Sequence, residues 1–87
     1  MVSESGVRVP KLAYLLARFP DRELAIHRLL ARDARFRELC EDFEDASKAL
    51  QHWEAAGSGG EAKAGDYRAL VAELEGELLA RLDGPPR

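Results

Sequence analysis

The sequence has little cysteine, few aromatic residues and no long apolar run, and each scarcity excludes a class of protein. A single cysteine, Cys40, allows no intrachain disulfide and no cysteine-based zinc cluster, which favours a reducing compartment. A membrane-spanning helix needs roughly 18 apolar residues in succession, and the sequence has no such run. The first residues carry Glu4 ahead of any basic residue and no long apolar core, which disfavours a secretory signal. We therefore expect a cytoplasmic protein without a membrane span.

The 87 residues form at most one domain, and their charge is unevenly distributed. Residues 1–37 contain eight Lys and Arg against four Asp and Glu, a net charge of +4. Residues 38–87 contain five against twelve, a net charge of −7, so the whole chain carries −3. Such an asymmetry serves either folding of a basic segment onto an acidic one or head-to-tail association of chains. It argues against strong nucleic-acid binding by the whole domain.

The clearest pattern is a heptad repeat that predicts a long helix over residues 34–56. Its apolar positions alternate three and four residues apart: Phe36, Leu39, Phe43, Ala46, Leu50 and Trp53. Asp33 is placed to cap this helix, although the chain could also continue straight through from the preceding segment. The run Gly57-Ser58-Gly59-Gly60 is too rich in glycine to remain helical and predicts a loop.

A second long helix follows the glycine loop and ends near Leu82. It begins either at residue 61, with Ser58 and Glu61 as a capping box, or at residue 66, with Asp66 as cap. Its apolar residues are Tyr67, Val71, Leu74, Leu78 and Leu82, with Leu70 and Leu79 widening the stripe on either side. A short loop makes the two helices antiparallel neighbours, with Phe36 near Leu78 and Trp53 near Tyr67.

The N-terminal third predicts one or two short helices ahead of this hairpin. Residues 1–9 are unpatterned and are expected to form a flexible tail. A helix over 10–19 would start at Pro10, and a second over 21–32 would have Asp21 as its N-cap. Its Ile26, Leu29 and Leu30 share a face, whereas Leu24 points elsewhere. The N-terminal helices would pack on the hairpin or reach a second chain.

The predicted fold is therefore all-α: an antiparallel helical hairpin resembling a coiled coil, preceded by one or two short helices in a small open bundle. A single helical domain spans residues 10–83, and residues 84–87 form a tail after the last helix. A two-helix hairpin alone is marginally stable, so the short helices complete a bundle or the chains self-associate.

The segment FPDRELAIHRLLARDARFRELCEDFEDASKALQHWE, the glycine loop and YRALVAELEGELLARL together resemble the YdcH-like family of small bacterial proteins. The shared pattern is Phe-Pro, a short helix, an acidic or amide residue before an "xRF" helix start, a long polar helix, and a leucine-rich last helix. It covers residues 19–82 and departs from the family in the longer N-terminus, at Trp53 and in the alanine-rich last helix. The resemblance implies a cytoplasmic, often self-associating helical hairpin of unknown function, with no catalytic residues to assign.

No residue pattern predicts catalysis, a cofactor or a metal. His27, His52 and Cys40 are not spaced to bring two ligands to one ion from one helix, so they are expected to be structural or surface residues. The carboxylates cluster at Glu38, Glu41, Asp42, Glu44 and Asp45. We interpret them as a solvated face with Glu44 paired to Lys48, and alternatively as a docking surface for a basic partner.

Two surfaces remain as functional candidates. The candidate interaction surface consists of apolar residues beyond the hairpin seam: Leu12, Leu15, Leu16, Phe19, Leu70 and Leu79. The candidate basic patch consists of Arg28, Arg32, Arg35 and Arg37. We expect a non-enzymatic protein-interaction or self-association module whose partner is another protein or its own copy in a homo-oligomer. The alternative is weak nucleic-acid binding through Arg28, Arg32 and Arg35, which would form one stripe on a continuous helix.

Overall fold

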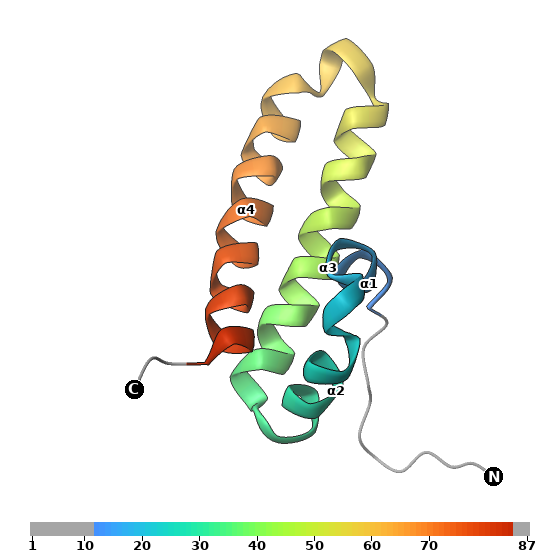
Figure 1. Cartoon of the computed structure of the whole chain (residues 1–87). Helices are drawn as coiled ribbons and strands as arrows, with labels where there is room; N and C mark the ends of the chain where they lie inside the picture. The colour runs from blue at the N-terminus through green and yellow to red at the C-terminus, as the bar shows by residue number, and fades with distance from the viewer. Residues whose placement is uncertain (1–11, 85–87) are drawn as a thin grey trace, which may run out of the picture.

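The computed structural model describes residues 12–84, which fold into four α-helices without a strand. The helices are α1 (Ala13–Arg18), α2 (Glu23–Arg32), α3 (Ala34–Ala55) and α4 (Glu61–Asp83). The long helices α3 and α4 form an antiparallel hairpin, and α1 and α2 lie against its lower half (Figure 1). The predicted all-α hairpin preceded by one or two short helices is confirmed, with two short helices present. The predicted tail over 1–9, the helix start at Pro10 and residues 85–87 lie outside the described residues.

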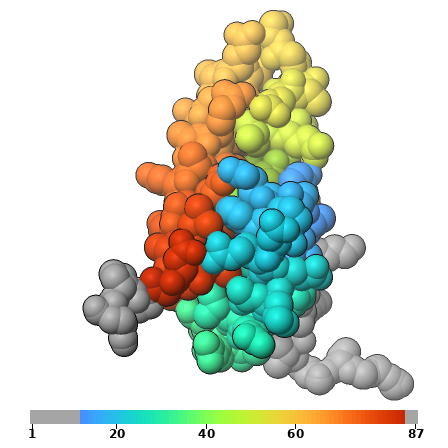
Figure 2. All heavy atoms as spheres, viewed as in Figure 1, coloured from blue at the N-terminus to red at the C-terminus, as the bar shows by residue number. Residues whose placement is uncertain are grey.

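The heptad repeat of α3 forms the seam of the hairpin. Phe36, Leu39, Phe43 and Ala46 are all buried, and they belong to one core cluster with Leu74 and Leu78 of α4. Nearer the loop, Leu50 and Trp53 are only partly buried. The core cluster therefore ends at Ala46 on α3 and at Leu74 on α4, below the upper part of the hairpin that α1 and α2 leave uncovered (Figure 2).

Both short helices complete this core from the same chain. Leu12 and Leu15 from the first segment, and Ile26 and Leu30 from α2, are buried in the cluster. A buried leucine or isoleucine contributes about 1.5–3 kcal/mol relative to exposure, so these side chains add substantially to a small core. The N-terminal helices therefore pack on their own hairpin, which decides the alternative left open by the sequence.

The chain breaks at Asp33 rather than continuing from α2 into α3. Asp33 has an extended conformation (φ −125°, ψ 101°), and its side chain accepts a hydrogen bond from the Phe36 amide, as an N-cap does. The predicted cap is confirmed. The prediction that Asp21 caps α2 is wrong: Pro20–Arg22 forms a 3₁₀ turn closed by the Arg22 amide on the Phe19 carbonyl, and α2 begins only at Glu23.

The glycine loop is confirmed, and α4 begins at Glu61, the first of the two predicted starts, but without the predicted capping box. Gly57 has a positive φ of 78°, which glycine adopts without strain, and Gly57–Gly59 forms a 3₁₀ turn. That turn places Gly60, not Ser58, at the N-cap of α4, and no side chain caps the helix there. The predicted capping box and the alternative start at Asp66 are therefore wrong, since α4 begins at Glu61 and Asp66 lies inside it.

Substitution of Gly60 and of Gly65 by alanine is expected to change the free energy of unfolding in opposite directions. A Cβ at Gly60 would lie 2.6 Å from the Trp53 carbonyl oxygen and 3.2 Å from the Ala56 Cβ, whereas a Cβ at Gly65 meets nothing within 4 Å. We expect Gly60→Ala to lower the free energy of unfolding by about 1–3 kcal/mol through this overlap. Gly65→Ala, inside α4, should raise it by about 0.5–1 kcal/mol. Urea unfolding followed by circular dichroism measures both, and equal stability of the two variants would contradict the packing at the loop.

Candidate functional site

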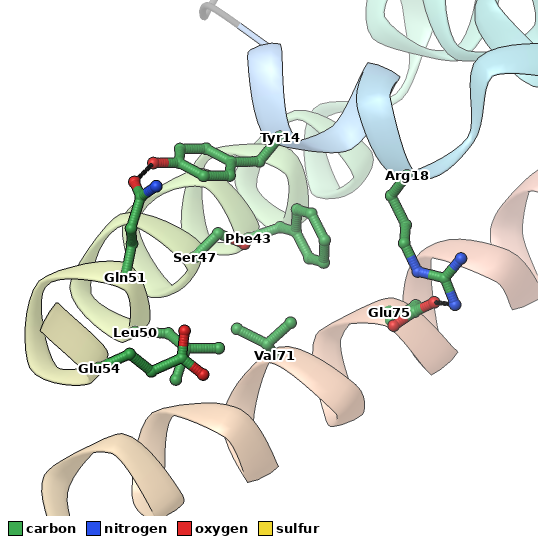
Figure 3. Close-up of a pocket in the computed structure, with 9 residues that line it drawn as sticks. All are labelled: Tyr14, Arg18, Phe43, Ser47, Leu50, Gln51, Glu54, Val71 and Glu75. Carbon is green, nitrogen blue, oxygen red and sulfur yellow. Dashed lines mark hydrogen bonds and ion pairs between the residues drawn. The ribbon is translucent and has the colours of Figure 1, made fainter. Parts of the chain in front are cut away.

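A hollow between α1, α3 and α4 lies where α1 meets the hairpin (Figure 3). Phe43, Leu50 and Val71 give it apolar walls. At its rim the Tyr14 hydroxyl donates a hydrogen bond to Gln51, and Arg18 pairs with Glu75 at 2.6 Å. These rim contacts tie α1 to both long helices. We therefore interpret the hollow as the edge of the α1 docking site rather than as a ligand site.

Hydrogen bonds to the Glu44 side chain of α3 hold α1 against the hairpin. Its Oε2 accepts a hydrogen bond from the Leu15 amide at 2.7 Å, and its Oε1 accepts one from the Tyr14 amide at 3.2 Å. Amides in the first turn of a helix lack intrahelical partners, and Leu12 at the N-cap has no side-chain acceptor to offer them. The Glu44 carboxylate of α3 therefore supplies the missing acceptor. Its negative charge also interacts favourably with the N-terminal end of the α1 helix dipole. The prediction of a Glu44–Lys48 pair is corrected, and the local sequence gives no signal of this contact.

The candidate interaction surface is largely absorbed by the core. Leu12 and Leu15 are only 5% and 0% exposed, which corrects their assignment to a surface. Leu16 and Phe19 are partly buried against the same core, and Leu79 is partly buried on α4. The physical reason is that α1 packs on its own hairpin. Of the predicted set, only Leu70 is an exposed large apolar side chain, at 40%.

The second exposed large apolar side chain of residues 12–84 is Leu24 on α2, at 65%. The sequence predicts that Leu24 points away from the buried face, but the candidate interaction surface does not contain it. Arg28 and Arg32 are exposed one and two turns further along the same side of α2. We refer to Leu24, Arg28 and Arg32 as the basic face of α2.

The predicted basic patch does not form as one stripe, because the break at Asp33 separates α2 from α3. Arg35 turns to Glu38 at 3.1 Å and Glu77 at 3.6 Å. Arg37 donates a hydrogen bond to the Leu30 carbonyl oxygen at 2.6 Å. The patch is thereby reduced to Arg28 and Arg32.

Leu70 lies in a shallow groove along the hairpin, on the flank opposite to α1. The groove is lined by Asp42, Asp45, Ala46, Ala49, Tyr67, Leu70 and Leu74. We call it the α3–α4 groove. At about 100° per residue, Asp42, Asp45 and Ala49 fall on the side of α3 away from Glu44 and Gln51, which contact α1. The groove has an apolar floor and a carboxylate edge.

Cys40 and the histidines form no reactive site. Cys40 is fully buried, and burial together with the nearby Glu44 and Glu41 carboxylates raises the pKa of its thiol to about 12. The thiolate needed for nucleophilic or metal chemistry is therefore suppressed at neutral pH. His27 lies 3.8 Å from Glu23, and His52 packs edge-on against Trp53. Over residues 12–84, no three His, Cys, Asp or Glu side chains gather to hold a metal ion.

Asp33 predicts a pH-dependent stability. The Phe36 amide at 3.0 Å, together with Arg81 at 2.9 Å, holds the pKa of the Asp33 carboxyl below its usual value. A depressed folded pKa stabilises the fold above the unfolded pKa of about 4, and this stabilisation is lost as the pH falls through the folded value. We expect Asp33→Asn to be less stable than the parent at pH 7, and the difference to shrink by pH 3.

The measurement is the urea midpoint at pH 7 and pH 3, with Asp66→Asn on the exposed side of α4 as the control. Asn still caps a helix, so the Asp33 variant isolates the effect of the charge. A difference from the parent that does not change between pH 7 and pH 3 would contradict the assignment.

None of the helices in the described part of the chain has the length and apolar character required to cross a membrane. Comparison with known proteins adds no relative: no family model, no curated protein and no solved structure matches this chain. The functional proposal therefore depends on the surfaces described above.

Proposed function

We propose that this chain is a non-enzymatic, cytoplasmic protein-interaction module that binds an amphipathic, basic helix in the α3–α4 groove. The observation that carries the proposal is the exposure of Leu70 beside Asp42 and Asp45. A partner helix would cover the apolar floor with its own leucines and meet the two carboxylates with Lys or Arg. The resemblance to the small, self-associating YdcH-like proteins of bacteria is part of the same proposal.

Isotope-edited NMR titration tests this function. The probe is a synthetic helical peptide with leucines on one face and lysines on the flanks, added to dilute labelled protein. We expect chemical-shift changes to concentrate at Ala46, Ala49 and Leu70, and to weaken with added salt. A control peptide with glutamine in place of leucine keeps the charge but loses the apolar contact. Equal binding of both peptides, or no change in the groove, would refute the proposal.

Weak nucleic-acid binding is the second candidate, and the exposure of Arg28 and Arg32 favours it. The diversion of Arg35 and Arg37 to contacts within the chain weakens it, because affinity for phosphates depends on the number neutralised. Gel-shift assays at moderate salt separate the two functions. Loss of a shifted band in Arg28→Ala/Arg32→Ala is required by nucleic-acid binding and is irrelevant to the groove.

A further inference from the structure

The two exposed large apolar side chains of residues 12–84 lie on surfaces of opposite charge. Leu24 precedes Arg28 and Arg32 on the same side of α2, and Leu70 lies beside Asp42 and Asp45 in the α3–α4 groove. We propose that the occupant of the groove is a second copy of this chain, whose α2 docks there by its basic face. The inference rests on the proposed function and names its partner.

The charges on both surfaces are available for such a contact. Every arginine of residues 12–84 other than Arg28 and Arg32 contacts a carboxylate or a main-chain oxygen in its own chain. Asp42 and Asp45 likewise take part in no ion pair among the described residues. Docking would bring these two pairs of opposite charge together while covering the apolar side chains Leu24 and Leu70 beside them.

The spacing along the helices matches when α2 runs antiparallel to α3 of the other copy. From Asp42 to Ala49 the groove rises about 10 Å, and from Arg32 back to Leu24 the basic face rises about 12 Å, at 1.5 Å per residue. Arg32 then lies opposite Asp42 and Arg28 opposite Asp45. Leu24 then lies at the end of the groove that Ala49 lines, between α3 and α4. One register therefore satisfies both charges and the apolar contact.

The two surfaces lie on different flanks of the molecule, so the association is head-to-tail. The α3–α4 groove opens on the flank of α3 away from α1, whereas α1 and α2 lie together on one face of the hairpin (Figure 2). When two chains join through two different surfaces, one α3–α4 groove and one basic face of α2 remain free on the pair. Copies would therefore add in succession as open chains rather than close as a dimer. The contact area of one short helix makes each step weak.

Two complementary variants test this association by sedimentation velocity. The face variant carries Arg28→Ser and Arg32→Ser, and the groove variant carries Asp42→Lys and Asp45→Lys. All four side chains are exposed, so both variants should fold, which circular dichroism checks. From about 10 µM to about 1 mM at low salt, we expect the parent's mean mass to rise without a plateau and each variant to remain monomeric.

The mixture of the two variants is the decisive sample. The intact basic face of the groove variant fits the intact groove of the face variant, whereas the two altered surfaces have no attraction for each other. We expect the mixture to associate and to stop at two chains. A parent that stays monomeric, a parent mass that levels at two chains, or a mixture that fails to associate would each overturn the proposal.

Cysteine cross-linking tests the register. Leu24→Cys with Ala49→Cys in one chain should give a ladder of disulfide-linked species under oxidation, whereas Leu24→Cys alone should not. Cys40 is buried and adds little background. If the parent stays monomeric while the lysine-rich peptide still perturbs the groove, self-association is refuted and the interaction function stands. If the peptide also leaves the groove unchanged, both are refuted.

Discussion

Phe36→Ala is expected to lower the free energy of unfolding by about 3–5 kcal/mol, the largest loss from any single substitution considered for this chain. Phe36 is fully buried where α3 begins, in the core cluster that joins Leu15 of α1, Ile26 of α2 and Leu78 of α4. Removing the ring leaves a cavity in the core cluster to which all four helices contribute. A chain of 87 residues has roughly 4–13 kcal/mol of total stability, so the variant should be largely or partly unfolded at 37 °C.

Urea unfolding at 25 °C, followed by far-ultraviolet circular dichroism, measures this loss. The matched control is Leu24→Ala, which truncates a side chain that is 65% exposed and should change the stability by no more than about 0.5 kcal/mol. Similar midpoints for the two variants would show that the four helices do not share one core. Leu24→Ala should also leave the fold of the single chain intact for the association experiments.

Glu44→Ala is expected to lower the free energy of unfolding by about 1–3 kcal/mol, because it leaves the Tyr14 and Leu15 amides without their acceptor. Hydrogen bonds to a charged carboxylate are stronger than neutral ones, so Glu44→Gln should fall between the parent and the alanine variant. The loss should be concentrated in α1. Amide hydrogen exchange at Tyr14 and Leu15 should accelerate more than exchange in the hairpin seam.

Glu41→Ala is the matched control for Glu44→Ala, since Glu41 is exposed one turn earlier on the same helix. It should change both stability and exchange at Tyr14 and Leu15 very little. If the two alanine variants behaved alike, the carboxylate of Glu44 would not hold α1 in place. Because α1 carries Leu12 and Leu15 into the core, the same measurement also reports how firmly the N-terminal segment is held.

Local patterns predicted the hairpin and the cap at Asp33, because both depend on neighbours in the sequence. The heptad from Phe36 to Trp53 requires only helical periodicity, and an aspartate before a helix requires only the next turn. The same local reasoning failed at Asp21 and Asp66. The start of α2 is set by the 3₁₀ turn Pro20–Arg22, and the start of α4 follows the 3₁₀ turn Gly57–Gly59.

Contacts between distant segments could not be derived in this way. Glu44 lies in a run of acidic residues that has the composition of a solvated face. Its contact with α1 joins residues about thirty positions apart in the sequence, and it forms only when α1 folds back onto α3. Leu70 and Asp45 belong to separate patterns in the sequence, and only the register of the hairpin brings them into one groove. The sequence places Leu12 and Leu15 in the candidate interaction surface because it does not decide whether α1 packs on its own chain.

The end of the core cluster at Ala46 and Leu74 gives the molecule a gradient of local stability. Beyond those residues the hairpin is a two-helix ribbon with partly buried Leu50 and Trp53, and α1 reaches it through the hydrogen bond from the Tyr14 hydroxyl to Gln51 (Figure 3). Such a ribbon opens with a smaller free energy than the base, in a cooperative unit of its own. We therefore expect the loop end to open and close while the four-helix base stays folded. We therefore expect insertions to be tolerated better, and proteolysis to be faster, at Gly57–Gly59 than in the four-helix base.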